Sequence, residues 1–365
     1  MRGVHAAALI LVAFSTLVLM GCASSRSEDE PQFGTLLDNV IATGAPGVLV
    51  VVRDNGTVRS EARGFADRSQ SIRMRVDERF RIGSITKTFV ATLALLLVED
   101  GSLRLDDTVE RWLPGLVPAG EVITVRDLLS HTAGLFDYVE DDRVLRDHER
   151  RWTPRELISI AVAHPPERSP PGGGFAYSST NYLVLGLIVE KAGGASLGHQ
   201  LRRRLFTPLG LRQTSFDPGA IRGLHVHGHR PPSHDGVVTG PPADTSSEPA
   251  WWTWAAGAIV STAGDLQRFY AALLHGGVLS APLQREMEML VPAGRLQYGL
   301  GIATFPTHCG QAWGHTGNVQ GTIAVAWNTK DASRQLVLVV NTYPLSAELE
   351  TAVGRLQDAA FCPAS

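Results

Sequence analysis

The sequence predicts an α+β fold, an α/β sandwich whose antiparallel sheet is built from the N-terminal and C-terminal segments of the domain and is flanked by helices. Three observations predict it. An apolar, mostly β-branched run at 48–52 starts an early hairpin, and four similar segments follow late, at 299–305, 311–315, 321–327 and 335–340. Residues 101–289 mostly follow the helical period of 3.6 instead. We therefore expect one folded domain at 34–362, with a mainly helical subdomain inserted at 101–289.

The first 22 residues predict export. Arg2 and His5 precede an apolar run at 6–19, which is too short to cross a bilayer comfortably. The run is followed by Gly21 and Cys22, which is typical of a lipoprotein signal whose Cys22 is acylated and becomes the new N-terminus. Ordinary secretory cleavage is the alternative. With acylation, the protein is a membrane-anchored lipoprotein that faces the periplasm or the cell exterior.

Residues 1–21 are then a signal peptide, and residues 22–33 form a flexible tether, because they are polar and charged and show no apolar periodicity. Arg2 is the one charged residue of the signal peptide, so its removal changes the formal net charge from −3 to −4. This mildly acidic balance does not indicate a nucleic-acid partner.

The sequence also indicates the first and last hairpin turns of the sheet and the helix that follows it. Asn55 and Gly56 separate the run at 48–52 from residues 57–64, and Asn-Gly is a strong signal for a two-residue hairpin turn. Residues 328–331 supply the last hairpin turn, and a terminal helix at 347–360 packs on the sheet. We expect the active site between the sheet and the helical insertion, since ligand sites concentrate in such clefts.

A candidate nucleophile lies at the start of a predicted helix. Ser84 follows an apolar run at 80–83 and precedes the apolar stretch 85–98, so it should stand where backbone N–H groups are free. Residues i and i+3 share a helix face, so the amine of Lys87 can reach the Ser84 hydroxyl. Lys87 must be neutral to accept the proton, and burial lowers its pKa. Taken singly, both residues are ordinary on a helix.

Two later motifs complete the pattern. The Tyr-Ser-Ser motif at 177–179 supplies a second basic oxygen from Tyr177, and the sequence leaves open whether Lys87 or Tyr177 takes the first proton. The His-Thr-Gly motif at 315–317 supplies a strand edge, where Gly317 lets the backbone approach a substrate closely. His315 is a site residue in this interpretation and a structural histidine in the alternative. The three motifs together predict a serine nucleophile with its bases.

In this order, the Ser-Ile-Thr-Lys, Tyr-Ser-Ser and His-Thr-Gly motifs resemble those of the serine beta-lactamase and D-alanyl-D-alanine carboxypeptidase family, in its class C-like branch. The resemblance extends from about Gly34 to Cys362 and includes three secondary signatures, at 129–135, at 181–186 and at 256–266. The His-Thr-Gly motif is most similar to that of the secreted D,D-carboxypeptidases of this branch. The resemblance implies a beta-lactamase/transpeptidase-like fold.

The resemblance also implies acyl-enzyme chemistry without a cofactor. Ser84 attacks an amide, ester or lactam carbonyl, and the backbone N–H groups of Ser84 and Asn318 bind the oxyanion. Substrate-binding residues are implied in the second and third motifs: Ser179, His315, Thr316 and Gly317.

We expect an exported serine hydrolase, most like a D-alanyl-D-alanine carboxypeptidase or transpeptidase that acts on cell-wall peptides and binds penicillins. A class C-like beta-lactamase, an esterase, and a penicillin-acylated sensor without turnover stay open as alternatives.

Two departures from the family pattern concern the substrate. Ser179 stands where the family usually has Asn, and a hydroxyl cannot donate and accept as a planar amide does. Ala303 stands where the similar carboxypeptidases have an Arg that helps to bind a terminal carboxylate. Trp251, Trp252 and Trp254 crowd before the 256–266 signature, and we expect Trp252 to line the cleft. The alternative is that all three pack beneath the loop.

The histidines of residues 223–248 and the two late cysteines are interpreted as structural residues, without a role in catalysis. Residues 223–248 contain several His residues together with Pro and Gly, which we interpret as a mobile loop at the rim of the cleft with no metal site. Cys309 and Cys362 should form a disulfide, because two cysteines in an oxidising compartment usually pair. Two buried thiols are the alternative.

Overall fold

The computed structural model describes residues 33–168, 170–234 and 237–362. The predicted signal peptide, the lipidation site Cys22 and the tether up to residue 32 lie outside the described residues. Phe33, assigned to the tether from the sequence, is instead the first residue of helix α1 (Phe33–Ala42). No helix among the described residues combines the length and the apolar character needed to cross a membrane.

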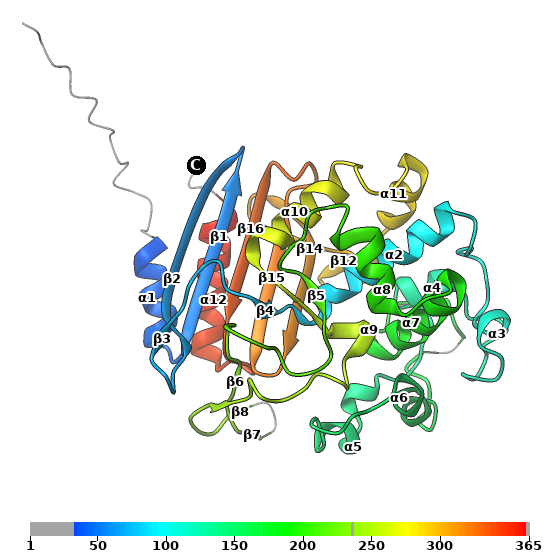
Figure 1. Ribbon diagram of the computed structural model, residues 1–365, viewed down its shortest axis with the longest axis horizontal. Coiled ribbons are helices and arrows are strands. Elements are labelled where there is room, and N and C mark those ends of the chain that lie inside the picture. The colour runs from blue at the N-terminus through cyan, green and yellow to red at the C-terminus, as the bar shows by residue number, and fades with distance from the viewer. Residues whose placement is uncertain (1–32, 169, 235–236, 363–365) are drawn as a thin grey trace, which may run out of the picture. The chain divides into compact units, whose positions relative to one another are not determined.

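A nine-stranded antiparallel sheet is the centre of the fold (Figure 1), in the order β11-β12-β13-β14-β15-β16-β1-β2-β3. Val48 of β1 lies opposite Val340 of β16, so the early hairpin is joined edge to edge with the late strands. The strands are β1 (Gly47–Asp54), β2 (Thr57–Asp67), β3 (Ile72–Arg73), β11 (Val291–Ala293), β12 (Leu296–Tyr298), β13 (Ala303–Thr307), β14 (Gly310–Val319), β15 (Thr322–Asn328) and β16 (Arg334–Val340).

The predicted strands all overlap strands of this sheet, although β14 extends four residues past the expected end at 315, and β3, β11 and β12 were not predicted. Asn55 and Gly56 form the first hairpin turn with positive φ angles of 47° and 89°, as an Asn-Gly turn requires. The strand expected at 299–305 is interrupted, because the Gly299 N–H donates to the Ile302 carbonyl at 2.8 Å in a turn. Gly301 has a φ of 80° in that turn, so β13 begins two residues later.

The two faces of the sheet are covered by different helices (Figure 1). Val48, Val50 and Val52 point to a cluster that includes α1 and α12 (Ala347–Phe361), whereas Leu49 and Val51 point to the larger core on the opposite face. This alternation follows from the two-residue period of a strand. Each fully buried Val or Leu contributes roughly 1.5–3 kcal/mol to folding.

The opposite face carries the helical part of the molecule. Helix α2 (Thr86–Glu99) packs against α7 (Ser179–Gly193) and α9 (Trp254–Gly257). The other elements are α3 (Val109–Trp112), α4 (Val125–Leu129), α5 (Asp142–Leu145), α6 (Pro154–Ala161), α8 (Leu197–Leu201), α11 (Ala281–Met287), a π-helical turn (Arg202–Phe206), and short strands β4 (Phe80–Arg81), β5 (Ser215–Phe216), β6 (His229–Arg230), β7 (Ser233–His234), β8 (Val237–Val238), β9 (Ala243–Asp244) and β10 (Ile259–Ser261).

One helix of the predicted insertion belongs to the sheet layer instead. Helix α10 (Ala263–Leu274) lies within residues 101–289, yet it packs on β15 and β16. The side-chain amide of Gln335 in β16 donates to the Gln267 carbonyl in α10 at 2.8 Å. The insertion at 101–289 is therefore not one continuous helical unit.

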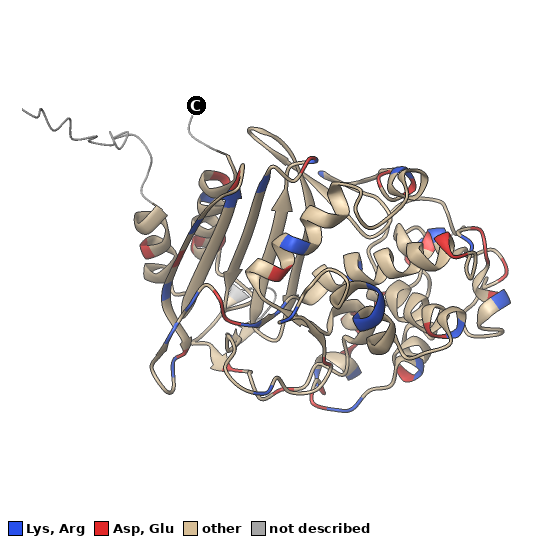
Figure 2. Ribbon diagram, turned by 45° about the horizontal axis from the view of Figure 1, so that its top comes forward, with Lys and Arg blue, Asp and Glu red and all other residues tan. Residues whose placement is uncertain are grey.

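The fold also contains one described disulfide bond, and its charged residues are widely distributed. Cys309, in the turn between β13 and β14, is bonded to Cys362, which follows α12. The bond ties the end of the terminal helix to the turn that leads into β14, the strand that carries the His-Thr-Gly motif. Figure 2 shows acidic and basic residues interspersed along the ribbon, in keeping with a formal net charge of −3.

Candidate active site

Ser84 lies in the 3₁₀ turn Gly83–Ile85 that leads directly into α2, so it precedes the first turn of the helix rather than beginning it. Gly83 has a φ of 50°, and a Cβ at this residue would lie 2.8 Å from the backbone nitrogen of Asn318. Glycine at 83 therefore permits both the turn and the close approach of β14.

Lys87 stands behind Ser84 with none of its surface exposed. Its Nζ donates to Ser84 Oγ at 2.9 Å and to the Ala256 carbonyl at 3.0 Å. Burial lowers the pKa of Lys87 to about 7, although the charge of Asp137 opposes that shift. Near neutral pH a large fraction of Lys87 is therefore uncharged and able to take the Ser84 proton.

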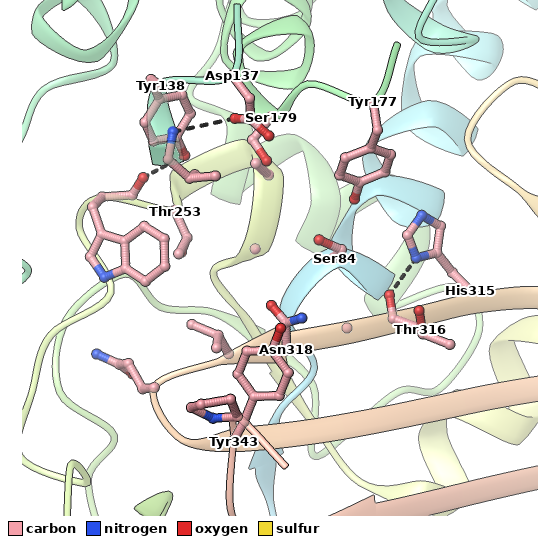
Figure 3. A pocket seen from close by; sticks show the side chains of 18 of the residues that line it. Ser84, Asp137, Tyr138, Tyr177, Ser179, Thr253, His315, Thr316, Asn318 and Tyr343 are labelled. Atoms are coloured by element: carbon pink, nitrogen blue, oxygen red, sulfur yellow. Dashed lines mark hydrogen bonds between the residues drawn. The ribbon is translucent and has the colours of Figure 1, made fainter. Parts of the chain in front are cut away.

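Tyr177 faces Ser84 from the other side of the cleft, as Figure 3 shows, with its hydroxyl directed towards that of Ser84. Its ring centroid is 5.0 Å from Lys87 Nζ. Burial of the hydroxyl raises the pKa of Tyr177 above its ordinary value, although 38% of the residue is exposed where it lines the cleft. Because the phenol stays protonated, the geometry favours Lys87 as the group that takes the first proton.

The third motif lies on an open strand edge. Strand β13 pairs with β14 as far as Gly314, which is opposite Ala303, so residues 315–319 pair with β15 on one side and with no described strand on the other. A Cβ on Gly317 would lie 2.0 Å from the Ile82 carbonyl oxygen and 2.7 Å from the Ser84 nitrogen. The backbones of Ser84 and Asn318 thus stand close together, where two N–H groups can bind one oxyanion.

His315 is neutral and has partners for both ring nitrogens. Nε2 accepts from the Tyr298 hydroxyl at 3.0 Å, and Nδ1 donates to the Thr316 carbonyl, which Figure 3 shows. Burial lowers the pKa of His315 to about 3, and the nearby charge of Lys87 acts in the same direction. The ring lines the cleft, but its hydrogen bonds fit a residue that positions the strand edge rather than a proton-transfer group.

A single cleft of about 700 Å³ brings the predicted residues together. Its volume lies within the range of small-molecule sites. Trp252 belongs to its wall and stacks on His148 with ring centroids 4.7 Å apart, whereas Trp251 and Trp254 do not line it. The predicted residues that line this cleft are Ser84, Tyr177, Ser179, Trp252, His315, Thr316, Gly317 and Asn318.

The two departures from the family pattern also lie in the cleft. Ser179 begins α7 and is almost buried, and Ala303 at the start of β13 offers no charge. Among the described residues that line the cleft, Arg230 is the one Arg or Lys, and its guanidinium pairs with Glu248 at 2.8 Å. No unpaired cation therefore stands ready for a substrate carboxylate among those lining residues.

Sequence reasoning missed Asp137, an acidic residue of the cleft (Figure 3). It is 6% exposed and accepts hydrogen bonds from the backbone N–H groups of Val139, at 3.3 Å, and Ser179. Burial raises the pKa of Asp137 to about 6, and the charge of Lys87 opposes the shift. The signal available in the sequence was one carboxylate in an apolar segment just after the 129–135 signature.

His131, within that signature, is a second residue without a predicted role. It is fully buried with a φ of 58°, and its Nδ1 accepts from the Ser178 backbone at 3.2 Å. Its ring packs against Tyr177 with centroids 4.2 Å apart. His131 therefore fixes the position of the Tyr177 ring from below the cleft.

Comparison with known proteins agrees with this geometry. The family model named Beta-lactamase matches residues 33–360. Penicillin-binding protein 4 of Amycolatopsis lactamdurans is 33% identical over 243 residues, which are 64% of this chain and 60% of that protein. The chain thus matches less than two thirds of the length of that relative.

Two solved structures match most of the chain. The D-stereospecific amidohydrolase from a Streptomyces species has a TM-score of 0.82 and 32% identity, over 92% of this chain and 100% of that one. The D-amino acid amidase from Ochrobactrum anthropi SV3, complexed with L-phenylalanine, has a TM-score of 0.80 and 27% identity, over 90% and 96% of the two chains. With the family model covering nearly all of the folded domain, the chain belongs to the beta-lactamase family and is a serine hydrolase of that family.

Proposed function

We propose that this protein is an exported serine acyl-enzyme hydrolase that cleaves the amide bond of D-amino-acid amides or short peptides whose D-residue carries a free ammonium group. The observation that carries this proposal is Asp137. Its carboxylate lines the cleft and is almost buried, and among the described residues it forms no ion pair with Arg, Lys or His. A buried carboxylate needs a positive partner or several hydrogen bonds, and a substrate ammonium supplies such a partner.

The reaction uses groups already in place. Ser84 Oγ attacks the amide carbonyl while its proton passes to neutral Lys87, and the oxyanion is bound by the N–H groups of Ser84 and Asn318. The proton then passes to the leaving nitrogen, from Lys87 directly or through Tyr177, and the C–N bond breaks to leave an ester on Ser84. Water hydrolyses that ester, with Lys87 again as the base.

Two names among the similar proteins support this substrate class. The Streptomyces amidohydrolase is described as D-stereospecific and the Ochrobactrum anthropi enzyme as a D-amino acid amidase, and both match about nine tenths or more of the present chain. A cleft with one buried carboxylate and no free lining cation suits a cationic substrate better than an anionic one.

The second candidate is a D-alanyl-D-alanine carboxypeptidase or transpeptidase that binds penicillins. The open edge at 315–319 favours it, because such an edge can pair with an extended peptide. The name of the Amycolatopsis lactamdurans relative, penicillin-binding protein 4, points the same way. Ala303 weighs against it, since no cation takes the place of the expected Arg. The described residues of the cleft show no feature that specifically favours beta-lactamase, esterase or non-hydrolysing sensor activity, although a relative named Esterase EstB, of Burkholderia gladioli, is 33% identical over 63% of this chain.

The test compares D-phenylalanine amide with N-acetyl-D-phenylalanine amide in the native protein and in Asp137→Asn. We expect the native protein to have a higher kcat/KM for D-phenylalanine amide than for its N-acetyl derivative. Asp137→Asn should lower the ratio of these two values by about tenfold to a hundredfold, as expected for the loss of a charged hydrogen bond. The ratio of the two substrates cancels any effect of the variant on Lys87. An unchanged ratio would show that Asp137 does not bind the ammonium.

Two further measurements test the second candidate, the D-alanyl-D-alanine carboxypeptidase or transpeptidase. Release of D-alanine from N,N′-diacetyl-L-lysyl-D-alanyl-D-alanine, faster than amide hydrolysis, would identify a carboxypeptidase. A lasting mass adduct with benzylpenicillin that is absent in Ser84→Ala would support penicillin binding.

We also propose that Cys22 carries the lipid anchor. Residues 6–19 followed by Gly21 and Cys22 support it. The native chain should then be labelled by palmitate and partition into detergent, and Cys22→Ala should not be labelled. Equal labelling of both proteins would contradict the anchor at Cys22.

A further inference from the structure

Three side chains from separate segments meet outside the catalytic cleft. Asp67 ends β2, His227 precedes β6, and Asp244 lies in β9. Each of them offers one ligand atom, and these atoms all lie within 4.8 Å of one another. His227 Nδ1 is 2.9 Å from Asp244 Oδ2 and 3.7 Å from Asp67 Oδ2. The histidines of residues 223–248 predict no metal site by themselves, because no carboxylate or cysteine pattern completes one, and Asp67 lies far away in the chain.

The cluster contains one buried oxygen without a partner. Asp67 is 1% exposed, and its Oδ1 accepts from the Ser69 hydroxyl at 2.6 Å and the Gln70 backbone at 3.1 Å. Its Oδ2 faces His227 and makes no hydrogen bond. A single proton on His227 Nδ1 reaches Asp244 and leaves that oxygen unsatisfied, which costs about 1–3 kcal/mol.

We propose that Asp67, His227 and Asp244 form a binding site for a divalent transition-metal cation of the zinc class. One imidazole nitrogen and two carboxylate oxygens are a mixed donor set that suits Zn²⁺ better than Ca²⁺ or Mg²⁺, which prefer oxygen alone. Ligands of a tetrahedral zinc site lie about 3.4 Å apart. Two of the observed spacings, 2.9 and 3.7 Å, bracket that value, and the third, between the two carboxylates, is at most 4.8 Å, so side-chain rotations can bring the three atoms around one ion.

The charge of the surroundings favours a cation. The two carboxylates outnumber the single imidazole, so the cluster carries net negative charge even when His227 is protonated. Glu78 adds a third carboxylate whose charge acts on His227, and its Oε2 is also buried without a partner. His225 packs beside His227 with ring centroids 4.8 Å apart. A divalent cation would take the place of the proton on His227 Nδ1.

The backbone around the cluster is already fixed. The His227 N–H donates to the Ala66 carbonyl at 2.9 Å, and its carbonyl accepts from Asn341 Nδ2 at 3.0 Å. The Asp244 Oδ1 accepts from the Ser246 backbone at 2.7 Å, which leaves Oδ2 directed at His227. Because the His227 backbone and the Asp244 carboxylate are held in this way, little ordering entropy is lost on binding.

The site would be structural rather than catalytic. It would tie residues 223–248 to the end of β2, and this segment supplies Arg230 to the cleft wall. The same segment holds the turn after β14, because Thr245 Oγ1 donates to the Gln320 carbonyl at 2.6 Å. The cation would therefore stabilise one rim of the cleft. This inference does not depend on the proposed substrate.

Zinc binding tests the inference directly. The full chain, without a polyhistidine tag, is stripped with a chelator and titrated with ZnCl₂ by calorimetry. We expect one Zn²⁺ per chain and a zinc-dependent rise in Tm. His227→Gln and Asp244→Asn should each weaken binding by at least about tenfold. Asp244 is partly exposed, so its isosteric variant should fold, which circular dichroism checks.

Matched controls separate this site from adventitious binding. His199→Gln changes an exposed histidine of α8 and should leave zinc binding unchanged. Co²⁺ should give visible d–d absorption in the native protein and none in His227→Gln. Binding that is equal in the native protein and in His227→Gln would overturn the inference, as would the absence of one tightly bound ion per chain. A preference for Ca²⁺ over Zn²⁺ would overturn the assigned metal class.

Discussion

Lys87 Nζ lies 2.9 Å from Ser84 Oγ and makes its other hydrogen bond to the neutral Ala256 carbonyl rather than to a carboxylate. The negative charge of Asp137, which is itself almost buried, raises the pKa of Lys87 through space. Burial lowers the pKa of Lys87 more than Asp137 raises it, and burial therefore favours the uncharged amine. The same arrangement makes the protonation of Lys87 sensitive to a single substitution in the cleft.

The pH dependence of catalysis follows from Lys87. Because the base must be neutral, kcat/KM for a substrate without an ionisable amine should rise with pH as Lys87 loses its proton, at a pKa of about 7. Asp137→Asn removes a negative charge that raises the pKa of Lys87, so the rising limb should move to lower pH. Rates of N-acetyl-D-phenylalanine amide hydrolysis measured across pH check this. A limb that stays in place or moves upward would contradict the coupling.

Ser84→Ala should abolish hydrolysis, because no other described side chain stands against Lys87 Nζ as an attacking oxygen. We expect kcat to fall by about a thousandfold or more. Ser102→Ala, at an exposed serine after α2, is the matched control and should keep native activity. Circular dichroism confirms folding of both variants. Native activity in Ser84→Ala would refute the assigned nucleophile.

Gly317→Ala tests the approach of β14 to the nucleophile. The new Cβ would lie 2.0 Å from the Ile82 carbonyl oxygen, so the strand edge must move away from Ser84. We expect kcat to fall by about 100-fold or more, as when an oxyanion donor is lost. Gly354→Ala, a helical glycine of α12 with open space around it, should leave kcat unchanged. Comparable kcat values for the two variants would rule out a strict requirement for this contact.

The Cys309–Cys362 disulfide should contribute to stability but not to catalysis. It closes a loop with a sequence separation of 53, and the double variant Cys309→Ser/Cys362→Ser should lose about 2–4 kcal/mol of unfolding free energy. Urea unfolding followed by tryptophan fluorescence measures the loss. A reductant should destabilise the native protein and have no effect on the double variant. Equal midpoints for the two oxidised proteins would contradict the prediction.

The sheet was largely predictable because its signals are local. Strand β1 and most of the late strands follow runs of apolar or β-branched residues, and Asn55 marks the first turn. Helix α12 ends one residue later than expected. Helix α10 was assigned to the wrong layer, because its amphipathic pattern shows that it has a buried face but not which surface covers that face. The interruption at Gly301 was missed for a similar reason, since a turn inside an apolar run leaves the pattern unchanged.

The site was predictable where a motif exists. Ser84, Lys87, Tyr177 and the third motif share a fixed order, and the structure places all of them in or behind one cleft. Asp137 has no such motif, because its importance comes from burial and from nearness to Lys87, which are properties of the folded chain.

The cluster of Asp67, His227 and Asp244 was not predictable from the sequence either, because it also depends on the folded chain. Its three members come from a strand end, a loop and a two-residue strand. No spacing rule links such positions.

The pairing of β1 with β16 places a condition on the synthesis of this protein. Val48 and Val340 are neighbours in the sheet, and β14 and β15 lie just beyond β16. A ribosome must therefore complete β16 before the sheet can close around the Ser84 turn. A nascent or truncated chain that stops before β14 carries the nucleophile and its lysine without the strand that faces them. Such long-range pairing also slows folding.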